Sequence, residues 1–492
     1  MAATLRRSVR HLATCVAIVW AAHASGAELE PCRLKGVPHE AQCGHVRRPL
    51  DPARPDGPTI DVHFAVLPAL ARNKRPDPVF FFAGGPGQSA IALAGPVAAQ
   101  LGRFGNRRDL VFIDQRGTGR SAPLSCDEPA DARRPLAELL DPAQQLARLS
   151  ACRERLMQLP HGDLRHYTTT IAMGDVEAVR QALGVGAVNL IGASYGTRAA
   201  LEYLRLHPQA VRRVVLDGAA PPDMVLPQSF STDNQAALDA MFDACAAEPA
   251  CRESHPQLPA QWRALLRALP REVVVAHPLL GRDEHLRLTV DMVLAMVRST
   301  LYVPTLAAAL PQAIADAGAG RLAPLFGLAS ALGGGRSDAR LYTGMHFSVV
   351  CAEDLPRRAA SADAPGADFG TAFGDWYARA CAEWPRGPVD PAFYTVPPAR
   401  VPVLVLSGGA DPATPPRHGA RVAAALGPAA RHEVVPHAGH GVMNLPCLRE
   451  LVFKFIDAAT DDAARALDFG CAAGMPRATA FVPLSRASGS RP

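Results

Sequence analysis

The sequence predicts an α/β protein in which a doubly wound, mostly parallel sheet is interrupted by a large helical insertion. Two observations lead to this fold class. Four short apolar runs, each followed by a glycine-containing turn, lie at residues 78–82, 110–113, 188–191 and 211–216. Runs that are apolar on both faces are typical of central strands in a parallel sheet covered by helices. The same strand pattern then disappears after Pro222 and resumes only at Val401.

The elements around these strands follow from the period of the apolar residues. Alternation from Ile60 to Val66 predicts an early, half-exposed antiparallel strand. A helix is predicted to begin at Asp175 and to end at Gly184, with its apolar side chains on one face. Residues 222–398 are rich in Ala, Leu and Pro and are predicted to be largely helical.

The C-terminal part returns to the earlier pattern. Strands are predicted at residues 401–406 and 433–435, and an amphipathic helix is predicted over 448–456. The chain has 492 residues, more than one compact core usually needs, so we expect one large domain carrying an insertion, or two domains. Along the chain, five segments are expected. These are a signal peptide (1–27), the N-terminal part of the sheet core (28–220), a helical cap (221–398), the C-terminal part of the core (399–476) and a disordered tail (477–492).

Composition and charge exclude two classes of partner. The chain is 48% hydrophobic and 20% charged, as globular proteins are, and its formal net charge is only +5. The basic residues are scattered and form no patch, so we expect no nucleic-acid binding. No segment after the N-terminus is long and apolar enough to span a bilayer, so we expect no stable membrane insertion.

The N-terminus has the layout of a secretory signal. Arg6, Arg7 and Arg10 precede a short apolar stretch at 12–22, and small residues that fit a cleavage site follow it. The stretch is too short for a stable anchor. A weak lipoprotein-like sequence ends at Cys15, but the apolar run follows this cysteine instead of preceding it, which disfavours lipidation. We therefore expect a soluble protein in the periplasm or the medium.

Cysteine usage agrees with export. Of eleven cysteines, Cys15 leaves with the predicted signal, and the other ten are an even number. Neighbours in sequence that would make plausible disulfides are Cys32 with Cys43, Cys126 with Cys152, Cys245 with Cys251, Cys351 with Cys381, and Cys447 with Cys471. The alternative, free buried cysteines in a cytosolic protein, conflicts with the signal peptide. No C-x-x-C pair supports a structural zinc site.

A candidate nucleophile, Ser194, lies in the motif Gly192-Ala193-Ser194-Tyr195-Gly196. The motif G-x-S-x-G follows a predicted buried strand and precedes a predicted helix, and its glycines permit the sharp turn that exposes the serine hydroxyl. The helix dipole would favour a developing oxyanion. Taken alone the motif could be an ordinary surface turn, so its weight depends on partner residues.

A serine nucleophile needs a base, and the base needs an orienting acid. Asp411 follows the predicted strand at 401–406, and His440 follows the next strand, between Gly439 and Gly441. The order Ser, Asp, His is the order of this arrangement in open α/β sheets, and both residues follow strand ends on the ligand-binding edge. The sequence therefore predicts Ser194, Asp411 and His440 as a catalytic triad.

Three alternatives exist at these positions. His437 could be the base, but the glycines beside His440 favour the latter. His437 and His440 could bind a metal, but no carboxylate or cysteine ligand is near them in sequence. Asp217 also ends a strand and could be the acid, although we expect it to cap the turn that leads into the insertion. A triad mechanism needs no metal or cofactor, and we expect none.

The oxyanion hole is predicted in the run Ala83-Gly84-Gly85-Pro86-Gly87, which follows an early strand. Glycines there let backbone N–H groups approach a substrate closely. We assign the N–H of Gly85, with Gly84 as second choice, and the N–H of Tyr195 beside the nucleophile. The alternative, a plain glycine turn, fits the strand order less well.

Together these motifs resemble the proline iminopeptidase branch of the α/β hydrolases, specifically its tripeptidyl-aminopeptidase-like group. The resemblance covers nearly the whole predicted mature chain. Its markers are Cys43-Gly44, Gly84-Gly85-Pro86-Gly87, Asp114-Gln115-Arg116-Gly117-Thr118-Gly119, Gly192-Ala193-Ser194-Tyr195-Gly196-Thr197 and Ser348-Val349-Val350-Cys351-Ala352-Glu353-Asp354. It implies the α/β-hydrolase fold with a helical cap inserted between sheet strands.

The resemblance also implies exported peptidases that remove residues from free N-termini, with acidic cap residues binding the substrate's α-amine. Glu353 and Asp354 are the candidates for this role; the alternative for both is a solvated loop or a helix cap. One departure is Ala83, where proline iminopeptidases usually carry His before the Gly-Gly-Pro-Gly run, and this weakens the inference to prolyl specificity.

Three functions are compatible with these residues. The first is a serine aminopeptidase acting on peptides; the second is an esterase acting on small esters, because one fold hosts both activities. The third is a non-catalytic binding protein, against which the complete triad argues. Epoxide hydrolases and dehalogenases need an aspartate at the position of Ser194 and are disfavoured.

Overall fold

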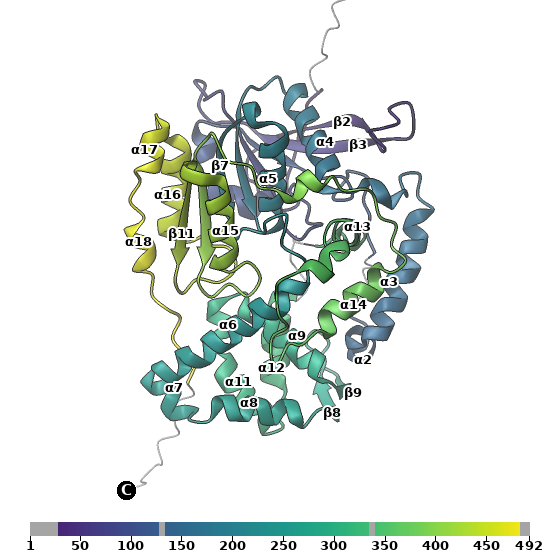
Figure 1. The fold of residues 1–492 in the computed structure, drawn as a ribbon, viewed down its shortest axis with the longest axis vertical. Coiled ribbons are helices and arrows are strands. Elements are labelled where there is room, and N and C mark those ends of the chain that lie inside the picture. Colours follow the sequence, from purple (N-terminus) through teal and green to yellow (C-terminus); the bar gives the residue numbers. More distant parts are fainter. Residues whose placement is uncertain (1–27, 127–132, 334–339, 483–492) are drawn as a thin grey trace, which may run out of the picture.

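A computed structural model of the protein describes residues 28–126, 133–333 and 340–482. The predicted signal peptide at 1–27 and the tail residues 483–492 lie outside the described residues. Figure 1 shows the sheet core in the upper half of the molecule and the helical cap below it.

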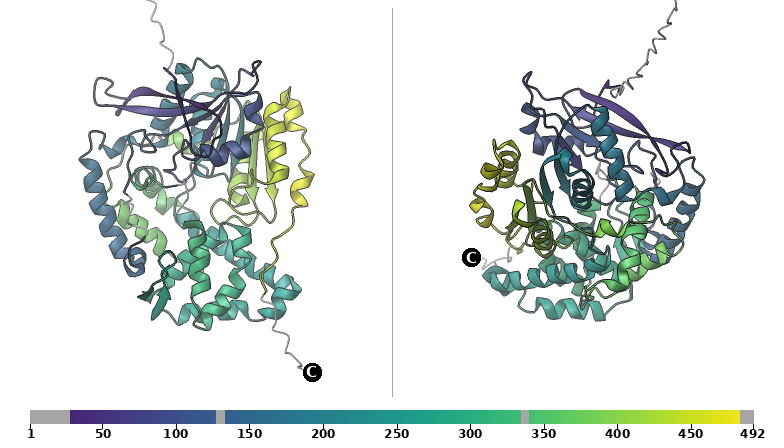
Figure 2. Two further views of the ribbon diagram at one scale, coloured as in Figure 1. Left: turned by 180° about the vertical axis from the view of Figure 1, so that it is seen from behind. Right: turned by 45° about the horizontal axis from the view of Figure 1, so that its top comes forward.

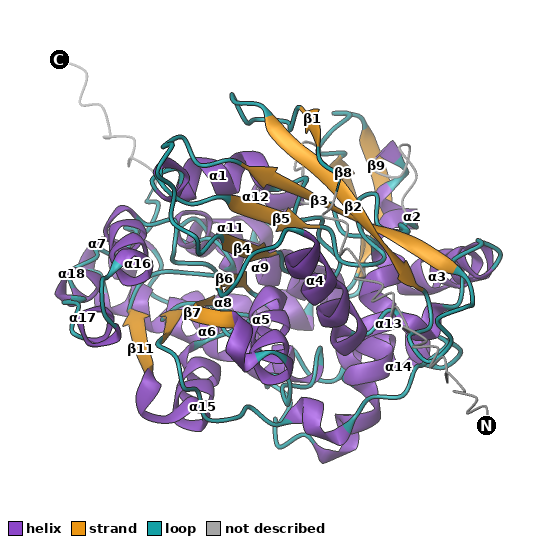
Figure 3. Cartoon of the chain, turned by 90° about the horizontal axis from the view of Figure 1, so that it is seen from above, coloured by secondary structure: helices purple, strands orange, loops and turns teal. Residues whose placement is uncertain are grey.

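The described residues form a nine-stranded sheet in the order β1-β2-β3-β5-β4-β6-β7-β10-β11. Figure 3 shows β3, β5, β4, β6, β7 and β11 following one another across the sheet. The strands are β1 (Glu30–Cys32), β2 (Ala41–Pro49), β3 (Thr59–Leu67), β4 (Val79–Phe82), β5 (Leu110–Ile113), β6 (Val188–Ala193), β7 (Val211–Asp217), β10 (Val403–Gly408) and β11 (Ala430–Val435). From β1 to β5 the neighbours pair antiparallel, and from β5 to β11 they pair parallel. The predicted doubly wound, mostly parallel sheet is therefore confirmed.

Helices cover both faces of this sheet, because the parallel strands are apolar on both sides. Phe80 and Phe82 of β4 pack into one core layer, whereas Val79 and Phe81 pack into the other. The first layer is closed by α3 (Pro142–Met157), α4 (Thr169–Ala182), α5 (Tyr195–Leu206) and α15 (Pro416–Leu426). The second is closed by α1 (Ala94–Leu101), α16 (Pro446–Asp457), α17 (Asp461–Arg465) and α18 (Gly470–Ala473).

The predicted start of one helix at Asp175 is wrong. Helix α4 begins at Thr169, and Asp175 lies buried in its middle. The carboxylate of Asp175 pairs with the buried guanidinium of Arg116, at 2.7 Å and 2.9 Å. Asp175 therefore forms a buried ion pair and does not cap the helix.

The chain between β7 and β10 forms most of the cap, and the predicted helical insertion is found there. Its elements are α6 (Gln228–Ala247), α7 (Pro249–Ser254), α8 (Leu258–Arg267), β8 (Arg271–Ala276), β9 (Asp283–Leu288), α9 (Val290–Leu301), α10 (Pro304–Ala307), α11 (Leu310–Gly318), α12 (Ala323–Gly333), α13 (Thr343–Glu353) and α14 (Ala372–Cys381). The β8–β9 hairpin was not predicted. Helix α2 (Leu136–Leu140) precedes Ser194 in the sequence but also belongs to the cap. The N–H of Leu136 donates to the carboxylate of Glu284 at 2.6 Å.

The cap has a core of its own, but α13 does not belong to it. Trp262, Leu286 and Val297 lie in the separate cap core. Met345 and Val349 of α13 pack instead with the sheet core. Helix α13 therefore joins the cap to the core near the end of β4.

The five neighbouring cysteine pairs named from the sequence are all disulfides in the structure. No helix in the described ranges is both long and apolar enough to cross a bilayer. Residues 477–482 of the predicted disordered tail run from α18 to the cap (Figures 1 and 2). Arg477 donates to the carbonyl of Ala244 at 2.9 Å, and the N–H of Phe481 donates to the carbonyl of Ala308 at 2.9 Å. These hydrogen bonds order the first residues of that segment, contrary to the prediction.

Candidate active site

Ser194 stands on a strained turn between β6 and α5. Its backbone has φ 56° and ψ −126°, a conformation that residues with a side chain rarely adopt. The flanking glycines make the turn possible: a Cβ on Gly192 would collide with the carbonyl of Gly196, and a Cβ on Gly196 with the carbonyl of Phe82. The G-x-S-x-G motif therefore forms the predicted strand-to-helix elbow, and the side chain of Ser194 is half-buried.

Asp411 and His440 form a hydrogen-bonded pair. Nδ1 of His440 lies 2.8 Å from Oδ2 of Asp411, whose side chain is buried. Burial by itself raises the pKa of Asp411, but the charge of His440 and the hydrogen bonds to this carboxylate outweigh burial and lower it. Burial likewise acts to lower the pKa of His440, but the charge of Asp411, its hydrogen bond to the ring and the charge of Asp217 together outweigh burial and raise the pKa. The ionised carboxylate only accepts, so Nδ1 carries the hydrogen and Nε2 is left to act as a base.

The end of β7 connects this pair with Ser194. The N–H of Ser194 donates to the carbonyl of Asp217 at 2.9 Å, and a Cβ on Gly218 would lie 3.5 Å from Cε1 of His440. Ser194, Asp411 and His440 therefore meet at one edge of the sheet. Ser194 Oγ makes no hydrogen bond with any described residue, so its bond to His440 is not formed in this conformation.

Asp217 has a different role from the one predicted. Its buried carboxylate accepts the N–H of Val442 at 2.9 Å and the N–H of Met443 at 3.0 Å. It thus holds the loop after His440, not the turn into the insertion. The pairing depends on residues far apart in sequence, so no local pattern could have indicated it.

Thr414 supports the same pair and was not predicted. Its hydroxyl lies 2.8 Å from Oδ2 of Asp411 and 3.2 Å from Nδ1 of His440. The N–H groups of Ala413 and Thr414 also donate to Oδ1 of Asp411, at 2.8 Å and 3.0 Å. The turn after Asp411 therefore fixes the orientation of the carboxylate. An Asp followed three residues later by Thr is a common turn pattern, which is the only signal the sequence offered.

One predicted oxyanion donor, Tyr195, follows Ser194 in the elbow, and the other, Gly85, lies in the glycine loop that packs against it. A Cβ on Gly84 would come within 3.1 Å of the Cβ of Ser194, so the glycine loop packs directly on the nucleophile. Gly85 has φ +110°, which favours glycine, and Tyr195 is the first residue of α5. In the described part of the chain, neither the Gly85 N–H nor the Tyr195 N–H donates to an acceptor. Both N–H groups are therefore available to a ligand.

A half-buried histidine, His346, supports the glycine loop and was missed in the sequence. Nδ1 of His346 lies 3.1 Å from the carbonyl oxygen of Pro86, and Nε2 lies 2.9 Å from the hydroxyl of Tyr377. A carbonyl accepts, so Nδ1 carries the hydrogen and Nε2 accepts from Tyr377. Burial lowers the pKa of His346 to about 4, which keeps the ring neutral.

Glu353 and Asp354 lie in the interior, around Arg198. The guanidinium of Arg198 contacts both oxygens of Asp354 at 3.1 Å and lies 3.6 Å from Oε2 of Glu353. Both carboxylates are 1% exposed. Glu353 also accepts the N–H of Thr169 at 2.6 Å and its hydroxyl at 2.9 Å, and that hydroxyl lies 2.7 Å from the hydroxyl of Tyr195. A chain of hydrogen bonds therefore connects Glu353 with the residue that follows Ser194.

Burial governs the charge of these two acids. It raises the pKa of Glu353 to about 7, because the charge of Arg198 only partly offsets the loss of hydration. It also raises the pKa of Asp354 against the opposing charge of the same arginine. One guanidinium thus faces two carboxylates, and Arg198 was not singled out in the sequence.

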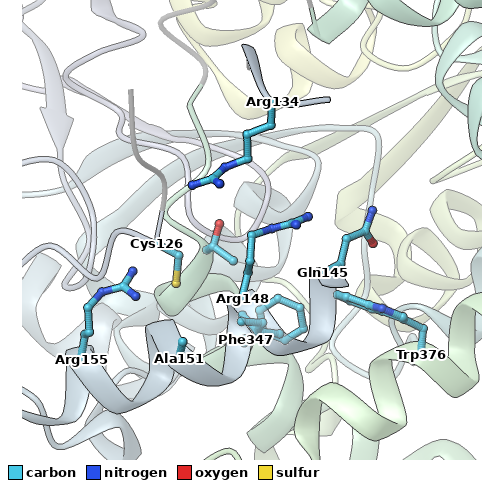
Figure 4. Close-up of a pocket in the computed structure, with 10 residues that line it drawn as sticks. Cys126, Arg134, Gln145, Arg148, Ala151, Arg155, Phe347 and Trp376 are labelled. Atoms are coloured by element: carbon cyan, nitrogen blue, oxygen red, sulfur yellow. The ribbon is translucent and has the colours of Figure 1, made fainter. Parts of the chain in front are cut away.

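A separate cavity of about 410 Å³ lies between α3, α13 and α14 (Figure 4). Arginine side chains of Arg134, Arg148 and Arg155 line it, together with Phe347 and Trp376. Its lining contains none of the predicted catalytic residues. In the residues that the structure describes, no group of three His, Cys, Asp or Glu side chains is arranged to hold a metal ion.

Two family models match this chain, and between them they contain the site. The model described as "alpha/beta hydrolase fold" matches residues 77–248, which include the glycine loop and Ser194. The model described as "TAP-like protein" matches residues 367–466, which include Asp411 and His440.

Curated relatives agree with these matches. Tripeptidyl aminopeptidase of Streptomyces lividans is 28% identical over 92% of this chain and 88% of its own length. Tripeptidyl aminopeptidase of Streptomyces coelicolor is 32% identical, but the alignment spans 40% of this chain and 39% of that relative. Serine protease Hip1 of Mycobacterium tuberculosis is 27% identical over 80% of this chain and 82% of its own length. Among solved structures, proline iminopeptidase of Mycobacterium smegmatis is 17% identical with a TM-score of 0.39, over 86% of this chain and all of that one. By its sheet, its cap and the two family models, the chain has the α/β-hydrolase fold with a TAP-like C-terminal region, and the curated relatives that it resembles over most of its length are named as a tripeptidyl aminopeptidase and a serine protease.

Proposed function

We propose that the protein is an exported aminopeptidase that releases residues or short peptides from free N-termini through an acyl-enzyme on Ser194. The observation that carries this proposal is the Asp411–His440 pair, 2.8 Å apart, at the same sheet edge as the strained elbow of Ser194. The relatives named as aminopeptidases support the substrate class.

The geometry supports the following mechanism. His440 Nε2 accepts the proton of Ser194 Oγ while this oxygen attacks the scissile carbonyl, and Asp411 stabilises the imidazolium that forms. In this conformation the Ser194–His440 hydrogen bond is open, and such bonds commonly tighten only when substrate binds. The N–H groups of Gly85 and Tyr195 would receive the oxyanion. His440 then returns the proton to the leaving amine, and water releases the acyl group.

We propose that Glu353 and Asp354 recognise the α-ammonium group of the substrate. The supporting observation is charge: two buried carboxylates share the single guanidinium of Arg198, so the cluster carries an excess of negative charge when both are ionised. An ammonium group nearby would offset that excess. Because both side chains are 1% exposed, the ammonium group would enter only with a shift of the residues that cover them.

A chromogenic panel of nitrophenyl esters, aminoacyl anilides and tripeptidyl anilides tests the proposed function. We expect the wild type to cleave peptide anilides and to be labelled by a fluorophosphonate. Ser194→Ala should lose both, whereas Ser254→Ala, at an exposed cap serine, should keep both. Hydrolysis of esters alone would favour the esterase, and no hydrolysis or labelling would favour a binding protein.

Export is a separate proposal with its own support. The five disulfides are typical of an oxidising compartment, and residues 1–27 have the composition of a cleavable signal. Expression with and without residues 1–27, followed by fractionation and N-terminal sequencing, tests it. A protein that stays in the cytoplasm with an intact N-terminus would contradict export.

A further inference from the structure

Arg298 is a cationic side chain of the cap that has no acidic partner among the described residues. It lies on α9, is half-buried, and makes no hydrogen bond or ion pair with any residue in the described ranges. Its guanidinium lies over the ring of Phe373 on α14, with the central carbon 4.2 Å from the ring centroid. The stacking leaves the edge of the guanidinium, with its five N–H donors, free to meet a ligand.

Two chains of contacts place Arg298 beside the candidate active site. Tyr302 is four residues further along and therefore on the same side of the helix. The carbonyl of Tyr302 accepts the N–H of His440 at 3.1 Å, and its ring meets the imidazole edge-on with centroids 5.1 Å apart. Arg298 is thus one helical turn from the residue that supports the candidate base.

The second chain runs to the oxyanion loop. Arg298 stacks over the ring of Phe373. This ring meets the ring of Tyr377 edge-on, with the centroids 5.1 Å apart. Tyr377 is the residue that hydrogen-bonds to His346, and His346 contacts the carbonyl of Pro86. The positive charge of Arg298 opposes the rise in pKa that burial causes at both Tyr302 and Tyr377. The guanidinium of Arg298 therefore lies between Tyr302, which contacts His440, and Tyr377, which supports the oxyanion loop through His346.

The carboxylates near Arg298 already form ion pairs with other cationic side chains. Asp411 pairs with His440, and Asp354 pairs with Arg198. Other arginines of the cap and its border do have acidic partners: Arg358 pairs with Asp375, and Arg417 with Asp233 and Asp363. A half-buried guanidinium loses hydration, and an aromatic face compensates only in part. An anionic group from outside the protein would complete the site.

We infer that Arg298 forms a subsite for a carboxylate of the peptide substrate. The inference rests on the proposed peptidase function and adds a substrate class, namely peptides that carry a carboxylate near the scissile bond. That carboxylate is either the C-terminus of a short peptide or the side chain of Asp or Glu. A guanidinium binds both through the same pair of N–H donors.

Two sets of peptides distinguish these sources. The first pair is Ala-Ala-Ala-Ala with a free C-terminal carboxylate and the same peptide with a C-terminal amide. The second set is amidated Ala tetrapeptides with Glu or the isosteric Gln at each position in turn. The quantity measured is the ratio of kcat/KM for the acidic peptide to kcat/KM for its neutral counterpart.

We expect the wild type to prefer the acidic member of at least one pair by about tenfold or more. Arg298→Met should bring that ratio close to one, and Arg298→Lys, which keeps the charge but loses the fork, should give an intermediate ratio. The matched control is Arg263→Met on the exposed face of α8, which should keep the wild-type ratio. The pair that responds identifies which carboxylate is bound.

A wild-type ratio below about tenfold for every pair, or a ratio that survives in Arg298→Met, would overturn the Arg298 subsite while leaving the peptidase proposal intact. If the wild type reacts with a fluorophosphonate but cleaves none of the peptides, the proposed function fails, and the subsite fails with it.

Discussion

The imidazole of His346 donates from Nδ1 to the carbonyl oxygen of Pro86 across 3.1 Å. Pro86 lies between Gly85, a proposed oxyanion donor, and Gly87, whose carbonyl accepts the N–H of Tyr342 at 2.8 Å. The loop beside Ser194 is therefore fixed from α13 on the cap side. Because the pKa of His346 is lowered to about 4, its ring stays neutral across the physiological range and keeps this single arrangement.

We predict that His346→Ala lowers kcat by about tenfold, because a misplaced oxyanion donor weakens binding of the transition state more than binding of the substrate. The KM should change little. His346→Asn, whose amide N–H can replace Nδ1–H, should restore most of kcat, whereas His346→Gln should not. Steady-state kinetics on a peptide anilide separate these effects, and equal losses in all three variants would indicate a general packing defect.

Activity should fall as the pH falls through the pKa of His440, because the base must be neutral to accept the proton of Ser194. The charge of Asp411 raises that pKa above 6.5, so the acidic limb of the profile of kcat/KM is expected above pH 6.5. Asp411→Asn removes the charge, which should move the limb to lower pH and reduce kcat on the order of ten-thousandfold. An unchanged limb in Asp411→Asn would contradict the assignment of His440 as the base.

The stability of the protein should depend on the protonation of Glu353. Its pKa is about 7 in the folded protein and 4.5 in the reference state, so the folded state holds this proton more tightly. The contribution is fully present below pH 4.5 and is lost as the pH rises through about 7. Glu353→Gln is a neutral isostere, and the free energy of unfolding of this variant should fall less than that of the wild type between these pH values. Urea titrations at several pH values measure the difference; parallel curves would show that Glu353 does not titrate in this range.

The central parallel strands could be predicted well from the sequence because most of their residues are apolar and buried. Strand β5 reads Leu-Val-Phe-Ile, and all four of its residues are buried. The hairpin of β1 and β2 was missed, since β2 alternates weakly and carries exposed polar residues such as His45 and Arg47. The β8–β9 hairpin lies within an Ala- and Leu-rich region whose composition suggested helices, although Leu286 and Leu288 do alternate with exposed residues.

In the candidate site, too, some residues could be predicted from the sequence and others could not. Ser194, Asp411 and His440 could be named because each follows a strand end in a recognisable turn. Arg198 could not, since its role depends on Asp354, 156 residues away in sequence. Glu353 and Asp354 were selected by resemblance to a family, and only the folded arrangement reveals that they share one guanidinium.

Substitution of Asp217 tests whether the candidate site depends on the anchoring of the loop that follows His440. Its carboxylate accepts the N–H groups of Val442 and Met443, and its own carbonyl accepts the N–H of Ser194. Asp217→Ala would leave two buried N–H groups unpaired, at a cost of about 1–3 kcal/mol for each unsatisfied group. We expect a lower free energy of unfolding and a lower kcat together, because the His440 loop loses its anchor.

Asp217→Asn is the matched control, because an amide oxygen can still accept one of these N–H groups. Its free energy of unfolding and its kcat should lie between those of the wild type and Asp217→Ala, as measured by urea unfolding and by kinetics on a peptide anilide. If Asp217→Ala loses activity without loss of stability, the carboxylate acts on the chemistry and not on the loop. If it loses stability while kcat is unchanged, the His440 loop does not need this anchor to place its imidazole.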